Sequence, residues 1–280
     1  MARGGVPLNA EERLRELQGR REFFTSNLSV NEFVLAADDG IRPLGQVMGS
    51  TVYHVGWQYT PMYQSSELTV LSHAQYHARL LALSRLQQEA RLLGAHGVLG
   101  VRLERQAQAW GDNLLEWTAR GTAIALDKGD VPALPFVCAL SGQEFWTLRR
   151  AGYYPAGFAF GTCVYYHVAS VLTQYATQGG PLGQGYAANT ELTDYTQAVY
   201  TARHAAMSRM EDEARRVAAE GIVGVRIEND IRTQEVEGGS TTGGSGTRRD
   251  LIVQFTVLGT AVVPRRDRWP VLDYALPLTG

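Results

Sequence analysis

The sequence is almost without lysine and close to electrical neutrality. Lys128 is the only lysine among 26 basic residues, so a phosphate-binding loop that ends in Gly-Lys-Ser or Gly-Lys-Thr cannot be present. The formal net charge of −2 argues against a general nucleic-acid-binding protein, because such a protein needs a basic surface to neutralise phosphates. We therefore expect no nucleic acid among its partners.

Long apolar runs and cysteine frameworks are also missing. No stretch reaches the roughly 18 apolar residues of a membrane span, and residues 1–24 hold no run of signal-peptide length. The two cysteines, Cys138 and Cys163, cannot build a disulfide framework or a Cys-x-x-Cys metal site. These absences predict a reduced, cytoplasmic protein without a membrane span. Its 280 residues are enough for two domains.

An internal duplication is the strongest pattern that the sequence contains. Residues 76–104 (YHARLLALSRLQQEARLLGAHGVLGVRLE) align with residues 200–228 (YTARHAAMSRMEDEARRVAAEGIVGVRIE) at an offset of 124, and 15 of the 29 positions are identical. Roughly 2 identities would arise from average residue usage. The match continues at an offset of 112 before this block and at 138 after it. The second copy is longer by glycine-rich insertions at 179–185 and 238–246.

Each copy predicts one long helix packed on a small sheet. Alanine-rich stripes at helical spacing indicate helices near 69–93 and 190–217, and alternating apolar residues predict a strand after each helix. The expected fold class is α+β: two tandem repeats of a β-β-α-β-β unit, each with one long helix on a small, mainly antiparallel sheet. The predicted parts are an N-terminal helical extension at 1–22, repeat 1 at 23–126, a linker at 127–135, repeat 2 at 136–263 and a proline-rich tail at 264–280.

Further motifs recur around the end of each long helix. They are the segment EARLLGAHGVLGV at 89–101, the Ala-Arg pairs at 78–79 and 202–203, and Gly-Thr-Ala at 121–123 and 259–261. Together they resemble the YbjQ-like family of bacterial domains, which is named for heavy-metal binding. The resemblance implies a homo-oligomer of closed, ring-like form, a pentamer in particular, so the expected partner is a further copy of the chain.

Two residue pairs are candidates for metal ligands. His73 and His77 are four residues apart on a predicted helix, so both could face one ion. Cys163 and His167 share one face of a predicted strand, and thiolate and imidazole suit a soft metal such as zinc or copper. Surface histidines and a buried packing cysteine are the alternative interpretation, because neither pair has a third ligand nearby. A heavy-metal ion is thus the one cofactor to consider.

Several charged residues occur at the same place in both copies. On the long helices their i, i+4 spacing suits salt bridges, and on the following strands they share a face. We interpret them as ion pairs within a domain or across a subunit contact. They are Arg85, Glu89, Arg102 and Glu104 in repeat 1, and Arg209, Glu213, Arg226 and Glu228 in repeat 2.

No catalytic constellation is apparent. The sequence has no Gly-x-Ser-x-Gly motif, no cysteine with a histidine kept in both copies and no repeated acid pair. We therefore expect a non-catalytic, oligomeric binding or scaffold protein with an unknown ligand, and not an enzyme. The alternatives are a soft-metal-binding protein of the zinc or copper class and an enzyme with its site between the repeats.

Overall fold

The structure is a computed structural model that describes residues 5–19, 25–60, 63–107, 114–178, 189–237, 247–266 and 268–275. Both predicted glycine-rich insertions, at 179–185 and 238–246, lie outside these residues. The elements in chain order are α1 (Leu8–Gly19), α2 (Val30–Asp38), β1 (Ile41–His54), β2 (Ser66–Glu67), α3 (Thr69–Leu92), β3 (Gly97–Ala107), β4 (Leu114–Leu126), β5 (Phe136–Val137), α4 (Gly142–Arg150), β6 (Tyr153–His167), α5 (Val171–Gln178), α6 (Thr193–Arg215), β7 (Gly221–Glu237) and β8 (Thr247–Pro264).

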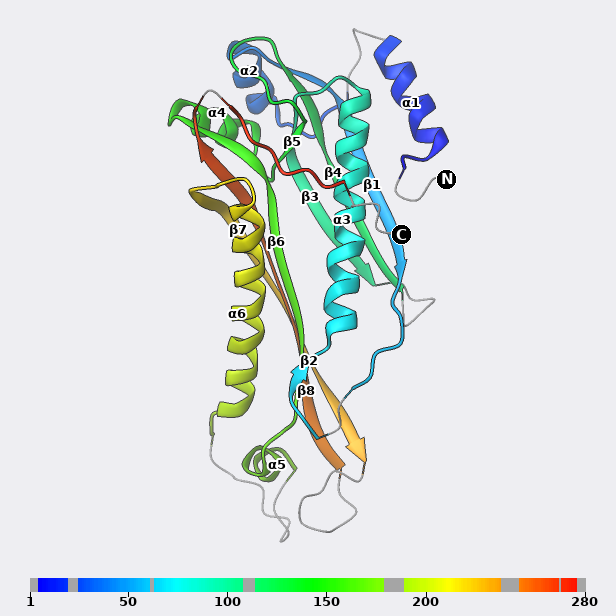
Figure 1. Cartoon of the computed structure of the whole chain (residues 1–280), viewed down its shortest axis with the longest axis vertical. Coiled ribbons are helices and arrows are strands. Elements are labelled where there is room, and N and C mark those ends of the chain that lie inside the picture. Colours follow the sequence, from blue (N-terminus) through cyan, green and yellow to red (C-terminus); the bar gives the residue numbers. More distant parts are fainter. Residues whose placement is uncertain are drawn as a thin grey trace.

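Two four-stranded sheets lie side by side, and each carries one long helix, α3 or α6 (Figure 1). Their strand orders are β1-β4-β3-β5 and β2-β6-β8-β7, and every pairing is antiparallel except the short one between β3 and β5. The predicted α+β fold with two tandem repeats is confirmed. None of the described helices is long and apolar enough to cross a membrane.

Each sheet includes one short strand that links it to the other half of the chain. The strand β2 precedes α3 in the sequence but pairs with β6, and β5 precedes α4 but pairs with β3. The backbone therefore ties the two halves together at two places. This exchange is a tertiary feature that the repeated sequence does not predict.

The alanine stripes bring each long helix close to the strand beneath it. Ala82 of α3 and Ala206 of α6 have no exposed surface, and Gly49 and Gly161 lie opposite them on the strands. A Cβ atom at Gly49 would collide with the carbonyl oxygen of Ala82, and one at Gly161 with that of Ala206. The small residues are thus required by the close approach, which is the same in both repeats.

The short helices α2 and α4 were not predicted, although the sequence contains a signal for them. Both begin after a Ser-x-x-Glu motif, Ser29 to Glu32 and Ser141 to Glu144. The backbone N–H of each serine donates to the glutamate Oε2, at 2.6 Å and 2.8 Å, and the glutamate N–H donates to the serine Oγ. This reciprocal arrangement is the capping box of a helix start.

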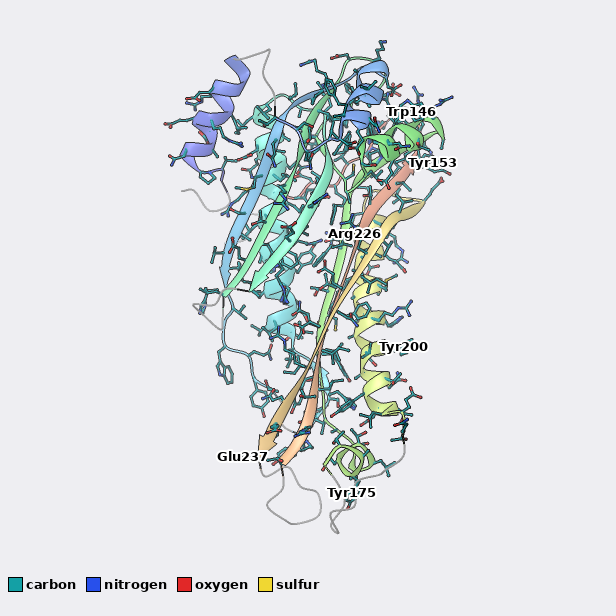
Figure 2. The ribbon with its side chains drawn as sticks, turned by 180° about the vertical axis from the view of Figure 1, so that it is seen from behind. Trp146, Tyr153, Tyr175, Tyr200, Arg226 and Glu237 are labelled. Carbon is teal, nitrogen blue, oxygen red and sulfur yellow. The ribbon has the colours of Figure 1, made fainter. Side chains whose placement is uncertain are left out.

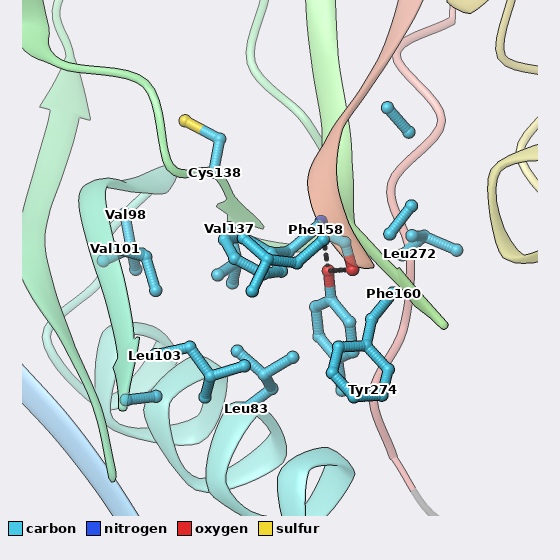
Figure 3. Close-up of a cluster of buried hydrophobic side chains, with 14 of the residues drawn as sticks. Leu83, Val98, Val101, Leu103, Val137, Cys138, Phe158, Phe160, Leu272 and Tyr274 are labelled. Atoms are coloured by element: carbon cyan, nitrogen blue, oxygen red, sulfur yellow. Dashed lines mark hydrogen bonds between the residues drawn. The ribbon is translucent and has the colours of Figure 1, made fainter. Parts of the chain in front are cut away.

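One continuous apolar core joins the repeats (Figure 3). The described part of the C-terminal tail, residues 268–275, packs into this core through Trp269, Leu272 and Tyr274. The backbone N–H of Phe158 in β6 donates to the Tyr274 hydroxyl oxygen at 2.5 Å, and Gln87 Nε2 of α3 donates to the Leu272 carbonyl at 3.1 Å. The tail therefore fixes the helix of repeat 1 to the sheet of repeat 2.

Candidate functional site: the contact between the repeats

A buried ion pair joins the two long helices. Arg79 of α3 has no exposed surface, and its Nη2 donates to Oε1 of Glu213 on α6 at 3.0 Å. The other carboxylate oxygen of Glu213 accepts the backbone N–H of Phe160 in β6 at 2.8 Å. Glu213 is thus held by its own sheet, and its bond to Arg79 fastens repeat 1 to repeat 2.

The guanidinium group of Arg79 relies on Glu213 and on aromatic rings. Its Cζ lies 3.3 Å from the ring centroid of Phe160 and 5.0 Å from that of Tyr76, which is a cation–π arrangement. Its Nε and Nη1 have no hydrogen-bond partner among the described residues. Burial lowers the pKa of Arg79 and the Glu213 carboxylate counteracts the change. The side chain remains charged, as arginine does in proteins, so losing its partner is costly.

A second ion pair crosses the same boundary in the opposite direction. Glu67 lies in β2, and its two carboxylate oxygens accept from Nη1 and Nη2 of Arg209 on α6, both at 2.7 Å. Arg209 also donates to the carbonyl oxygen of Thr162 in β6 at 2.5 Å. A bidentate pair of this kind fixes geometry as well as adding energy. Each repeat therefore supplies one arginine and one carboxylate to the boundary.

The counterparts of these four residues, at an offset of 124, lie at the two outer ends of the repeat pair. Two of them, on repeat 2, are exposed, and the other two lie on α3 and bond to the backbone of β1. The counterparts are Arg203 for Arg79, Glu191 for Glu67, Glu89 for Glu213 and Arg85 for Arg209. The contact between the repeats is thus made once inside the chain, and the equivalent residues at the two ends have other partners, such as Arg13 for Glu89.

The expected i, i+4 salt bridge on the first helix does not form. Arg85 instead donates to the carbonyl oxygen of Ser50 at 2.5 Å. Glu89 accepts the N–H of Met48 at 2.9 Å and pairs with Arg13 of α1 at 3.1 Å. Burial raises the pKa of Glu89, and the Met48 amide and Arg13 offset part of the rise. The reason is the alanine stripe, which brings the helix so close to β1 that strand backbone groups are within reach.

The second helix departs from the same expectation for the same reason. Arg209 and Glu213 do not pair with each other but bind the backbone of β6 and the charged residues Glu67 and Arg79 of repeat 1. The i, i+4 spacing predicted a pair between these two residues, whereas the structure gives both of them other partners. The true partners come from segments that are distant in the sequence.

The repeated strand residues also lack the pairing expected along their own strands. Glu104 accepts from Nη2 of Arg120 on β4 at 2.7 Å, because Arg120 lies diagonally opposite on the neighbouring strand. Arg102, Arg226 and Glu228 are exposed, and Figure 2 shows Arg226 on β7. These strand charges take no part in the contact between the repeats.

Repeat 2 exposes apolar side chains whose counterparts in repeat 1 are buried. Val101 and Leu103 of β3 are 2% and 8% exposed, because they contact the core that repeat 2 completes (Figure 3). Val225 and Ile227 occupy the same positions on β7 and are 42% and 52% exposed. We name this surface the open flank of repeat 2, and it consists of Tyr200, Arg203, Val225, Ile227 and Ile231. Figure 2 shows Tyr200 on the side of α6 turned away from α3.

The predicted metal ligands Cys163 and His167 do not converge. They lie four residues apart on β6, and a strand rises about 3.3 Å per residue, so the two backbone positions are about 13 Å apart. Burial, assisted by the Glu67 carboxylate, raises the pKa of Cys163 to about 12, which disfavours the metal-binding thiolate. No group of three or more His, Cys, Asp or Glu is placed to hold a metal ion in the part of the chain that the structure describes.

The histidines His73 and His77 lie on an exposed face of α3. Their ring centroids are 6.5 Å apart with an interplanar angle of 84°. Burial and then the neighbouring His73 lower the pKa of His77, which favours the neutral form of this imidazole. A neutral imidazole is a competent metal ligand, but a third ligand does not stand beside this pair among the described residues.

A serine–histidine–aspartate cluster was missed by sequence reasoning, because its members come from three distant segments. His167 contacts Ser65 Oγ through Nδ1 at 3.1 Å and Asp194 Oδ2 through Nε2 at 3.5 Å. The Ser65 oxygen also accepts the N–H of Val168 at 2.9 Å, and Asp194 accepts from the Thr173 hydroxyl. These bonds tie Ser65 of repeat 1 and Asp194 at the start of α6 to the end of β6 and the residue that follows it. The boundary between the repeats, where an enzyme site was considered, is filled by the apolar core and the tail.

Comparison with known protein families places both repeats in one family. The profile of the family described as "Putative heavy-metal-binding", YbjQ_1, matches residues 42–127 and 186–265. The chain belongs to this YbjQ-like family and contains two of its domains. The encapsulin nanocompartment protein Rv1762c of Mycobacterium tuberculosis is 41% identical over 225 residues, which are 78% of this chain and 81% of that protein. No solved structure matches the chain significantly.

Proposed function

We propose that this chain is a non-catalytic scaffold that assembles with further copies of itself through its YbjQ-like repeats. The open flank of repeat 2 is the observation that carries the proposal. Its apolar residues Val225 and Ile227 are half exposed, whereas the same positions in repeat 1 are buried by a neighbouring repeat. Exposed apolar surface of this kind marks an interaction site.

The proposed assembly is head to tail, because the flank that repeat 2 exposes differs from the flank that repeat 1 exposes. A heterologous contact forms a ring if the rotation closes and a filament if it does not. Each chain carries two units, so a ring of whole chains holds an even number of units. A ring of five units is therefore excluded, and a pentamer of chains would contain ten.

The mass of the purified protein tests the proposal. Light scattering coupled to gel filtration is expected to give a multiple of the chain mass of 30.7 kDa. The variant Ile227→Asp places a charge on the open flank and is expected to lower that mass, while its melting temperature stays unchanged. Val131→Asp is the matched control, because Val131 is similarly exposed but lies outside the flank. A monomeric wild-type protein, or an Ile227→Asp variant of unchanged mass, refutes the proposal.

The relative from Mycobacterium tuberculosis supports a role of this scaffold at an encapsulin compartment. We place the protein in the bacterial cytoplasm, and its two free cysteines are consistent with a reducing compartment. Co-expression with an encapsulin shell protein tests the association, because a bound scaffold sediments with the shell. Recovery of the chain only in the fractions of free protein contradicts it.

Heavy-metal binding is the alternative that the family description supports. Of the candidate pairs, the neighbouring rings of His73 and His77 support this alternative better than the widely separated Cys163 and His167. Elemental analysis after incubation with zinc or copper, with His73→Ala as the comparison, decides this alternative. Less than one ion per chain, together with an unchanged melting temperature, dismisses it, because a ligand that binds only the folded state raises stability.

A further inference from the structure

The contact between repeat 1 and repeat 2 inside the chain indicates how repeat 2 of one copy could meet repeat 1 of another. We propose that the open flank of repeat 2 in one copy binds the opposite flank of repeat 1 in a second copy, with Arg203 paired to Glu89 and Glu191 paired to Arg85, and that helix α1 covers this receiving flank until the second copy displaces it. The inference rests on the proposed self-association. It adds the surface of repeat 1 that the second copy binds, and it identifies α1 as a segment of the same chain that competes for this surface.

The part of the receiving flank that lies on β1 has the properties of an uncovered half-interface. Met48 and Val52 of β1 are 49% and 56% exposed. Their counterparts at an offset of 112, Phe160 and Val164, are almost fully buried, and both belong to the region of β6 that repeat 1 covers. The same two positions are therefore apolar in both repeats but covered in only one of them.

The charges on the two outer flanks are complementary. The receiving flank presents the carboxylate of Glu89 and the guanidinium of Arg85, whose buried Nε has no hydrogen-bond partner among the described residues. The open flank of repeat 2 presents exposed Arg203 and, at the start of α6, exposed Glu191. Two pairs of alternating sign would form, as they do inside the chain, and the alternation fixes the register of docking.

The helix α1 makes an ion pair with repeat 1 that resembles one of the two ion pairs between the repeats. Arg13 pairs with Glu89 at 3.1 Å, just as Arg79 pairs with Glu213 at 3.0 Å, and Leu14 beside it is buried against the core. Across Figure 1 the order is α6, α3 and α1, so α1 lies on the side of α3 that is turned away from α6.

The ion pair that α1 makes is more exposed to water than the ion pair between the repeats. The side chain of Arg13 is 47% exposed, whereas Arg79 is fully buried. A partly hydrated pair contributes little stability, so a better-buried arginine can replace it. Repeat 1 thus carries a docking site for a second copy, and α1 occupies the Glu89 part of that site through a weak contact.

A charge-reversal experiment tests the proposed partner surface. Glu191→Arg and Arg85→Glu are each expected to weaken self-association about tenfold or more, because each places like charges at the contact. The double variant Glu191→Arg/Arg85→Glu restores opposite charges between neighbouring copies and is expected to recover most of the affinity. Arg215→Glu is the control, because Arg215 lies at the end of α6 and pairs with Glu211 and Asp212 of its own helix.

If Arg85→Glu fails to fold, Arg203→Glu provides the second measurement, since Arg203 is exposed. A double variant no tighter than the weaker single variant, or an Arg203→Glu variant that associates like wild type, overturns the assigned surface. Association of wild type through another face, including α1 of another chain, would appear as full affinity in all these variants.

A change in α1 tests the competition separately. Arg13→Ala is expected to tighten association several-fold, because it weakens the cover without touching Glu89. Arg15→Ala is the control, because Arg15 is exposed and pairs with Glu11 on the same helix. Unchanged or weakened association in Arg13→Ala overturns the role of α1 and leaves the proposed scaffold intact. A monomer in every variant refutes the scaffold itself, so the two failures are distinguishable.

Discussion

The two repeats contain a matched pair of glutamates in which the same substitution should have different effects. Glu213 and Glu89 occupy equivalent helix positions, and each accepts a backbone N–H from its own strand. Glu213 faces the fully buried Arg79, whereas Glu89 faces Arg13, whose side chain is half exposed. Replacing each glutamate by glutamine keeps an acceptor for the strand and removes only the charge.

Glu213→Gln is expected to lower the free energy of unfolding by about 3–5 kcal/mol, because it leaves the charge of Arg79 buried without a counter-ion. Glu89→Gln is expected to cost about 1 kcal/mol or less, because Arg13 can turn to water. Urea unfolding followed by tryptophan fluorescence measures both, with Trp117 as a buried reporter. Equal losses in the two variants would refute the reasoning.

The double variant Arg79→Met/Glu213→Gln sharpens this prediction. It removes both charges, so no unpaired ion remains in the interior, and it should be more stable than Glu213→Gln alone. Losses that simply add would show that Arg79 and Glu213 do not depend on each other.

Three further predictions follow from single contacts. Burial by itself would raise the pKa of Asp194, but hydrogen bonds from the Thr173 hydroxyl and the backbone amide of Ser170 outweigh burial and lower the pKa to about 2. The contribution of Asp194 to the free energy of unfolding is therefore complete above about pH 4 and is lost as the pH falls towards 2. Asp194→Asn should remove this acid-dependent part of the unfolding curve, and an unchanged curve would contradict the assignment. The thiol of Cys163, whose pKa burial raises to about 12, should resist alkylation at pH 8 until the protein unfolds, which a mass shift would report. Gly161→Ala should prevent stable folding, seen as insoluble expression, because the new methyl group meets the Ala206 backbone; a soluble variant with a native melting temperature would disprove the close approach.

The short capping motifs and the helix stripes show how much local sequence can determine. The stripes at Ala82 and Ala206 identified both long helices and the sheet-facing side of each, because periodicity depends only on neighbouring positions. The Ser-x-x-Glu motifs were equally local and could have revealed α2 and α4. The repeat itself, and with it the family, is a property of the sequence alone.

Tertiary structure alone decided how the two repeats meet. The sequence marked Glu89 and Glu213 as equivalent, yet one faces α1 and the other faces a buried arginine of the first repeat. That difference arises because α3 and β2 of repeat 1 pack against the side of repeat 2 that holds Glu213, whereas the equivalent side of repeat 1 meets the helix α1. Identical residues therefore acquire different energies from their neighbours. Burial and distant contacts, which local spacing does not encode, separate the closed contact inside the chain from the open flanks at its ends.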